Sequence, residues 1–113
     1  MTIKEWQSTV DDWINNIGVR YFSELTNMAI LSEEVGELAR HISRAYGEQS
    51  YKIPLTNEES KKKIADELAD ILFVTTCLAN QINIDLEKAV EENMIKKTNR
   101  DSERHHSNKK LNN

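Results

Sequence analysis

The sequence is poor in the residues that interrupt helices or cross-link chains. Its 113 residues include three glycines, one proline and one cysteine. A lone cysteine, Cys77, excludes an internal disulfide and fits a reducing compartment. With so little glycine and proline, and with many strong helix formers, the composition favours an all-α chain.

The sequence also lacks a long apolar run and a strong excess of one charge. The longest apolar stretch, ILFVTTCLA at 71–79, is too short to cross a bilayer, and the N-terminal MTIKEWQSTV has no signal-peptide core. Fifteen Lys+Arg against 19 Asp+Glu give a net charge of -4, which argues against nucleic acid or an anionic membrane as the main partner. We therefore expect one cytoplasmic domain, small enough that a partner subunit would enlarge its core.

Hydrophobic periodicity predicts four helices. The first follows a Thr2–Glu5 capping box and ends at Gly18, the second spans about 23–46, and the third about 57–81. The fourth begins after Asp85 and reaches about residue 100. The third is apolar nearly all round in its second half, so we expect it to be central and buried. The expected fold is an all-α, four-helix bundle-like domain over residues 1–100, completed by oligomerisation, with a disordered polar tail at 101–113.

Two of the predicted helices carry carboxylate pairs beside their apolar stripes. Glu34 and Glu37 fall on one strip of LSEEVGELAR (31–40), and His41 lies one turn further on. Glu67 and Asp70 repeat the i, i+3 spacing within ADELADILFV (65–74). Side chains at this spacing meet on one face, so each helix presents two carboxylates together.

The mutual repulsion of such carboxylates must be offset by a proton or by a bound cation. Two carboxylates about 5 Å apart repel by roughly 3 kcal/mol at an effective dielectric of about 20. A solvated helix face is the ordinary interpretation of the Glu34 pair taken alone, whereas the apolar surroundings of Glu67 favour protonation or a bound cation. Carboxylate oxygens suit Mg²⁺, with Mn²⁺ as a substitute, better than zinc. A di-iron centre is disfavoured, because His41 follows Glu37 by four residues instead of three.

The predicted fourth helix has a polar and cationic face. Asn93, Lys97 and Arg100 follow one another at spacings of four and three residues. Such donors would suit phosphate oxygens beside a metal site. Cations near a helix C-terminus also complement the helix dipole, so a purely structural role is the alternative.

Taken together, the two carboxylate motifs resemble a known family. Glu34-x-x-Glu37 in EEVGELARHI, followed by Glu67-x-x-Asp70 in ADELADILFV, is similar to the MazG-type nucleotide pyrophosphohydrolases of the all-α NTP pyrophosphatase superfamily. The resemblance runs from about residue 21 to residue 100. It includes the pattern NxxxKxxR at 93–100, which resembles the family's phosphate-binding end.

The resemblance implies Mg²⁺-dependent hydrolysis of (deoxy)nucleoside triphosphates to the monophosphate and pyrophosphate, in nucleotide-pool house-cleaning by a homodimer or homotetramer. The implied metal ligands are Glu34, Glu37, Glu67 and Asp70. Glu33 would orient or deprotonate the attacking water. The implied phosphate-binding residues, contributed across a subunit boundary, are Asn93, Lys97 and Arg100.

Two other functions stay open, and base recognition is unassigned. The alternatives are a phosphoribosyl-ATP pyrophosphohydrolase of the same fold and a helical module that binds metal or nucleotide without turnover. Tyr21 and Phe22, just before the second helix, are candidates for stacking on a base. Trp6 and Trp13 lie on the apolar stripe of the first helix, where packing in the core or against another subunit is the expected role.

Overall fold

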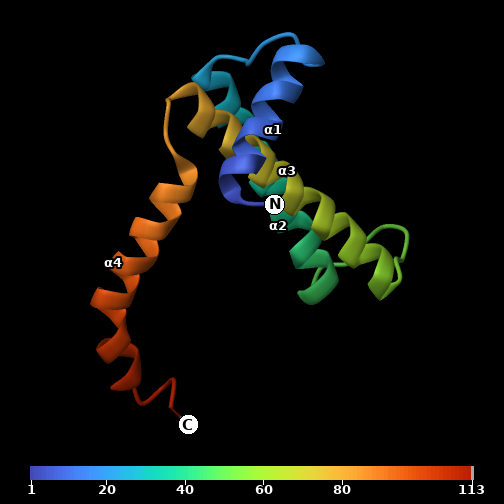
Figure 1. Ribbon diagram of the computed structural model, residues 1–113. Helices are drawn as coiled ribbons and strands as arrows, with labels where there is room; N and C mark the ends of the chain where they lie inside the picture. The colour runs from blue at the N-terminus through green and yellow to red at the C-terminus, as the bar shows by residue number, and fades with distance from the viewer. Residues whose placement is uncertain (113) are drawn as a thin grey trace.

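The computed structural model describes residues 1–112, which form four helices and no strand (Figure 1). The helices are α1 (Ile3–Asn16), α2 (Glu24–Tyr46), α3 (Asn57–Gln81) and α4 (Leu86–His106). The predicted all-α fold class is confirmed. Within this described range, no helix is both long enough and apolar enough to cross a bilayer.

Each helix starts at a residue whose side-chain oxygen accepts a hydrogen bond from the backbone N–H three positions on. These N-caps are Thr2, Ser23, Thr56 and Asp85. At Thr56 the cap is reciprocal, because the Glu59 carboxylate accepts from the Thr56 backbone N–H. Such caps satisfy N–H groups that have no partner inside the helix, so the chain itself sets these starts.

The body of the molecule is the antiparallel pair of α2 and α3, with α1 packed across the end of α3 that leads into α4 (Figure 1). The buried cluster beneath α1 consists of Val10, Ile14 and Cys77, and the half-buried rings of Trp6, Tyr21 and Phe73 pack against it. Burial raises the pKa of the Cys77 thiol to about 11, so the thiol stays protonated and unreactive at neutral pH.

A polar network joins α1, the α1–α2 linker and the start of α4. Asn80 Nδ2 donates to the Gln7 carbonyl and to the Tyr21 hydroxyl, and Gln7 Oε1 accepts from the Leu86 backbone N–H at 2.8 Å. The Tyr21 hydroxyl in turn donates to the Asp11 carboxylate at 2.6 Å. Burial and then this bond raise the pKa of Tyr21 to about 12. This network fixes the point at which α4 leaves the body of the molecule.

Beyond its first turns α4 projects away from the α2–α3 pair (Figure 1). The radius of gyration is 18.0 Å, against about 13 Å for a compact domain of this length. Large apolar side chains are consequently exposed on α3 and α4, including Leu68, Leu72, Met94 and Ile95. The prediction of a buried α3 holds at Val74, Thr76 and Cys77, and is wrong at Leu68 and Leu72, which are exposed.

Helix α4 continues to His106 instead of ending near residue 100. Residues 101–106, predicted to be disordered, are therefore helical. Asp101 accounts for the extension, because it pairs with Arg104 at 3.8 Å and with His105 at 3.9 Å, the i, i+3 and i, i+4 neighbours that stabilise a helix. The last residue of the predicted tail, Asn113, lies outside the described range.

Candidate metal centre and adjoining pocket

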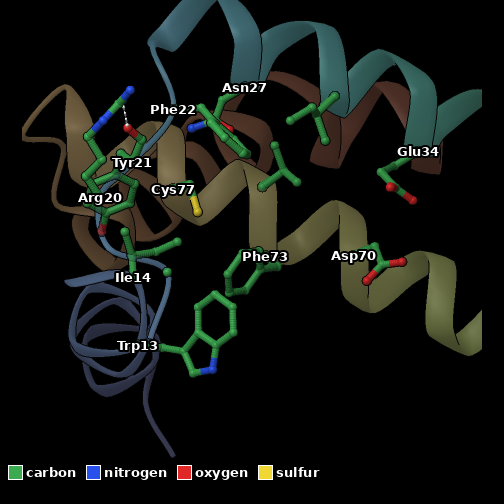
Figure 2. Close-up of a pocket in the computed structure, with 13 residues that line it drawn as sticks. Trp13, Ile14, Arg20, Tyr21, Phe22, Asn27, Glu34, Asp70, Phe73 and Cys77 are labelled. Atoms are coloured by element: carbon green, nitrogen blue, oxygen red, sulfur yellow. Dashed lines mark hydrogen bonds between the residues drawn. The ribbon is translucent and has the colours of Figure 1, made fainter. Parts of the chain in front are cut away.

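The pairing of α2 with α3 brings the two carboxylate motifs together. One oxygen from each of Glu34, Glu67 and Asp70 lies within 4.8 Å of the other two. Figure 2 shows Glu34 on α2 and Asp70 on α3 on the facing sides of the two helices. Glu67 is only 9% exposed. The structure thus groups three of the four metal ligands that the sequence predicts.

Two oxygens of this cluster have no hydrogen-bond partner among residues 1–112. Glu34 Oε2 and Glu67 Oε2 are both buried and unpaired. The close approach of the Glu34 carboxyl group, and next burial, raise the pKa of Glu67 above its usual value. Because unpaired buried carboxylate oxygens are costly, the cluster is satisfied only by a proton or a cation. Three carboxylates on rigid helices fit a hard divalent cation, which takes oxygen ligands.

Glu37 and Glu33 lie on the outer side of the cluster. Glu37 is exposed and is not one of the three grouped carboxylates, although its contact with Glu67 partly offsets the rise in the pKa of Glu67. Glu33 is also exposed and lines a shallow hollow with Gly36, Glu37 and Arg40. These two glutamates therefore face solvent within one chain, at the border of the buried cluster.

His41, on the same strip of α2, belongs to a different contact. Its Nδ1 lies 2.9 Å from the Tyr51 hydroxyl, and the two rings are 5.8 Å apart. This contact ties the loop between α2 and α3 to the side of α2. His41 is accordingly a structural residue here and is not one of the grouped ligands.

The cationic face of α4 does not reach the carboxylates of its own chain. Asn93, Lys97 and Arg100 are exposed on the part of α4 that projects from the body (Figure 1). The Arg100 guanidinium forms two hydrogen bonds to Asp101, of 2.9 Å and 2.8 Å. A single chain thus leaves the predicted phosphate-binding residues away from the predicted metal ligands.

An apolar pocket of about 390 Å³ opens beside the carboxylates, between α1, α2 and α3. Glu34 and Asp70 lie at one end of it and Tyr21 at the other, with Phe73 between (Figure 2). Trp13 meets Phe73 edge to face, with ring centroids 5.6 Å apart and an interplanar angle of 88°. The volume falls in the range of small-molecule sites.

The sequence did not predict that Trp13 and Asn27 line this pocket. Trp13, expected to be covered, is 46% exposed and lines the pocket. Asn27 was not singled out, although it lies seven residues before Glu34 and therefore on the same face of α2. That spacing was the available signal. Tyr21 and Phe22, the predicted stacking candidates, do line the pocket.

Comparison with known proteins places this geometry in a family. The MazG nucleotide pyrophosphohydrolase domain matches residues 22–105, a range that contains every carboxylate of the cluster. The chain belongs to the MazG nucleotide pyrophosphohydrolase family. This MazG domain is therefore a hydrolase that acts on nucleotides, in a family that generally depends on metal ions. The resemblance seen in the sequence is confirmed.

Its relatives include proteins of known structure. Protein YpjD of Bacillus subtilis is 43% identical over 103 residues, which cover 91% of this chain and 89% of YpjD. The Bacillus-conserved MazG protein, a nucleotide pyrophosphohydrolase, aligns with a TM-score of 0.69 at 43% identity, over 85% of this chain and 88% of that one. The solved structure of Bacillus subtilis YpjD gives a TM-score of 0.74 at 42% identity, over 85% and 94%.

Proposed function

We propose that this MazG domain hydrolyses (deoxy)nucleoside triphosphates to the monophosphate and pyrophosphate in a Mg²⁺-dependent reaction, with Mn²⁺ as a substitute. The observation that carries the proposal is the pair of unpaired buried oxygens on Glu34 and Glu67, beside a pocket large enough for a nucleoside. The role we infer is house-cleaning of the nucleotide pool in the cytoplasm.

The ligands we assign are Glu34, Glu37, Glu67 and Asp70. The proposal is supported by the oxygens of Glu34, Glu67 and Asp70, which lie within 4.8 Å of one another, and by the contact of Glu37 with Glu67. A bound Mg²⁺ ion would neutralise phosphate charge and polarise the phosphoryl group under attack. The buried position of Glu67 keeps water from competing for its oxygens.

In the reaction we propose, water attacks the α-phosphorus and the bond to the bridging oxygen of the pyrophosphate breaks. Glu33 is exposed, precedes Glu34 directly and shares a hollow with Glu37, and we assign it to orient the water and accept its proton. Asn93, Lys97 and Arg100 would donate hydrogen bonds to phosphate oxygens of the substrate. The pocket aromatics would hold the nucleoside so that the α-phosphorus faces the carboxylates.

The shape of the chain supports assembly into a homodimer or homotetramer. A projecting α4 with exposed Met94 and Ile95, and exposed Leu68 and Leu72 on α3, leaves apolar surface that a second copy would cover. The same contact would carry the cationic face of α4 from one copy to the carboxylates of another. We therefore assign the phosphate-binding residues to the neighbouring subunit.

The decisive experiment is pyrophosphate release from a panel of NTPs and dNTPs, with Mg²⁺ or with EDTA. We expect release only with the metal, and its loss in Glu67→Gln. The matched control is Glu58→Gln, an exposed glutamate in the first turn of the same helix, which should leave the rate unchanged. A folded, Mg²⁺-binding protein that releases no pyrophosphate from any nucleotide, phosphoribosyl-ATP included, would contradict the proposal.

A second measurement separates Glu33 from the metal ligands. Glu33→Gln should lower kcat while leaving KM and Mg²⁺ affinity nearly unchanged, because Glu33 contributes no oxygen to the grouped cluster. Glu34→Gln should weaken Mg²⁺ binding as well as turnover. If both substitutions weaken Mg²⁺ binding equally, Glu33 is a ligand and another group must accept the proton.

A further inference from the structure

Besides Glu34 of the carboxylate cluster, the pocket has one polar side chain in its α2 wall. Asn27 is 5% exposed and lines the pocket, although it is an amide in the middle of an apolar surface. Its Nδ2 donates to Gln81 Oε1 at 2.7 Å. Among residues 1–112, no group donates to its Oδ1. Asn27 Oδ1 is therefore an acceptor that a ligand carrying a hydrogen-bond donor could use in this mostly apolar pocket.

Gln81 fixes which end of the Asn27 amide is unused. Gln81 Nε2 donates to the Phe22 backbone carbonyl, so Gln81 Oε1 must be the atom that accepts from Asn27. The Asn27 nitrogen is thereby committed to Gln81, and the carbonyl oxygen is left as the acceptor. This chain of amides starts at a fixed backbone group, which keeps Asn27 from rotating to present its nitrogen instead.

Away from Glu34 and Asp70, the other polar side chains of the pocket are donors or are engaged within the chain. The Tyr21 hydroxyl donates to Asp11 and accepts from Asn80. Arg20 Nη1 donates to the Tyr21 backbone carbonyl. The Cys77 thiol is buried and only a weak hydrogen-bonding group. Away from the carboxylates, the acceptor that the pocket offers beside its aromatic surface is Asn27 Oδ1.

The position of Asn27 matches the far edge of a nucleobase. Asn27 precedes Glu34 by seven residues, which places it about 10 Å along α2 from the carboxylates at 1.5 Å per residue. A nucleotide whose α-phosphate lies at the carboxylates extends over such a span to the ring edge opposite its sugar. That edge carries an amino donor in cytosine and adenine, and a carbonyl acceptor in uracil, thymine, guanine and hypoxanthine.

We propose that this pocket is a nucleobase site in which Asn27 selects bases that present an amino group at this edge, namely cytosine and adenine. The inference rests on the proposed function for the placement of the phosphates. An amino group supplies the donor that Asn27 Oδ1 lacks, whereas a carbonyl brings two acceptors together with no hydrogen between them. Trp13 and Phe73 supply the aromatic walls and accept either ring size.

The experiment compares nucleotides that differ at this one position. We would measure kcat/KM for dCTP against dUTP and for dATP against dITP, together with calorimetric binding of dCMP against dUMP. We expect the amino member of each pair to be favoured about tenfold or more, because the wrong partner leaves a buried acceptor unpaired. The triphosphate of 2-pyrimidinone, which has neither amino nor carbonyl group at that position, should fall between dCTP and dUTP.

Substitutions test whether Asn27 causes the preference for amino-bearing bases. Asn27→Leu should reduce the ratio of dCTP to dUTP to near one, and Gln81→Leu should reduce it partly by freeing the Asn27 amide to rotate. Asn15→Leu, an exposed asparagine on α1 that does not line the pocket, is the matched control and should keep the wild-type ratio. The pyrimidinone comparison needs no variant, so the inference stays testable even if Asn27→Leu fails to fold.

The outcomes separate this inference from the proposed function. Turnover with no base preference, or with a preference that Asn27→Leu leaves unchanged, would overturn the role of Asn27 and leave the hydrolase intact. Selective binding of dCMP over dUMP without any turnover would support the pocket and overturn the proposed reaction. An absence of both binding and turnover would overturn the two together.

Discussion

Trp6 donates a hydrogen bond from its indole Nε1 to Thr76 Oγ1 at 2.8 Å, and Thr76 is completely buried. The Thr76 hydroxyl itself donates to the Leu72 carbonyl one turn back in α3. This pair links α1 to the C-terminal part of α3, the end that leads into α4. A single hydroxyl thus satisfies both an indole donor and a backbone acceptor.

Thr76→Val keeps the volume of the side chain and removes that hydroxyl. We expect it to destabilise the fold by about 1–3 kcal/mol, because the Trp6 donor then has no partner in the interior. Urea unfolding followed by circular dichroism measures the loss. A variant that also carries Trp6→Phe should show less than the sum of the two single effects, and strict additivity would mean that the bond contributes little.

Glu67→Gln should change how the metal-free protein responds to pH. The folded-state pKa of Glu67 is raised from 4.5, so its neutral form favours folding, fully at pH below 4.5, and that contribution is lost as pH rises through the folded pKa. The glutamine variant mimics the neutral form, so in EDTA it should be more stable than wild type at neutral pH and less sensitive to pH. Thermal melts from pH 4 to pH 8 test this, and a fall in stability at neutral pH would contradict it.

Gly36 lies in the middle of α2 with open space around it. A Cβ added there meets nothing within 4 Å. Gly36→Ala should therefore stabilise an isolated chain by about 1 kcal/mol through helix propensity alone. Chemical denaturation measures the gain. A loss of stability, together with a shift toward smaller species in gel filtration, would instead show that a neighbouring subunit approaches α2 closely at this glycine.

Val19 holds a backbone conformation that β-branched residues rarely adopt. Its φ is 75°, and it is 81% exposed, so no buried contact compensates for the strain. Val19→Gly should stabilise the fold by about 1 kcal/mol in denaturation experiments. Asn83, with φ of 61°, is the matched control, because asparagine tolerates this region and Asn83→Gly should change stability little. Equal effects of Val19→Gly and Asn83→Gly on stability would show that backbone strain at Val19 is not the cause of the gain.

The sequence predicted those features that depend on local chemistry. The helix starts at Thr2 and Asp85 follow from capping, and the meeting of Glu34 with Glu67 follows from helical spacing once α2 and α3 pair. The end of α4 was missed because ion pairs of Asp101, without an apolar stripe, extend it.

The pocket could not be predicted in this way, because it depends on contacts between residues far apart in the sequence. Trp13 lines it because α1 crosses α3 at one particular place, and Asn27 presents its oxygen because Gln81, far away in the sequence, holds its nitrogen. Neither relationship leaves a periodic pattern along the chain. The apolar stripe predicts that Trp13 packs against other side chains. It does not predict which ring Trp13 contacts or what fraction of the Trp13 side chain stays exposed.

The departure of α4 from the body has a genetic consequence. If one copy supplies the carboxylates and its neighbour supplies the cations, lesions in the two halves of the site are complementary. A chain with Glu67→Gln and a chain with Lys97→Ala, each inactive alone, would form mixed dimers in which one site carries both lesions and the other carries none. Random re-assembly of equal amounts should restore about a quarter of the wild-type activity. Two defective alleles of this gene would therefore rescue one another.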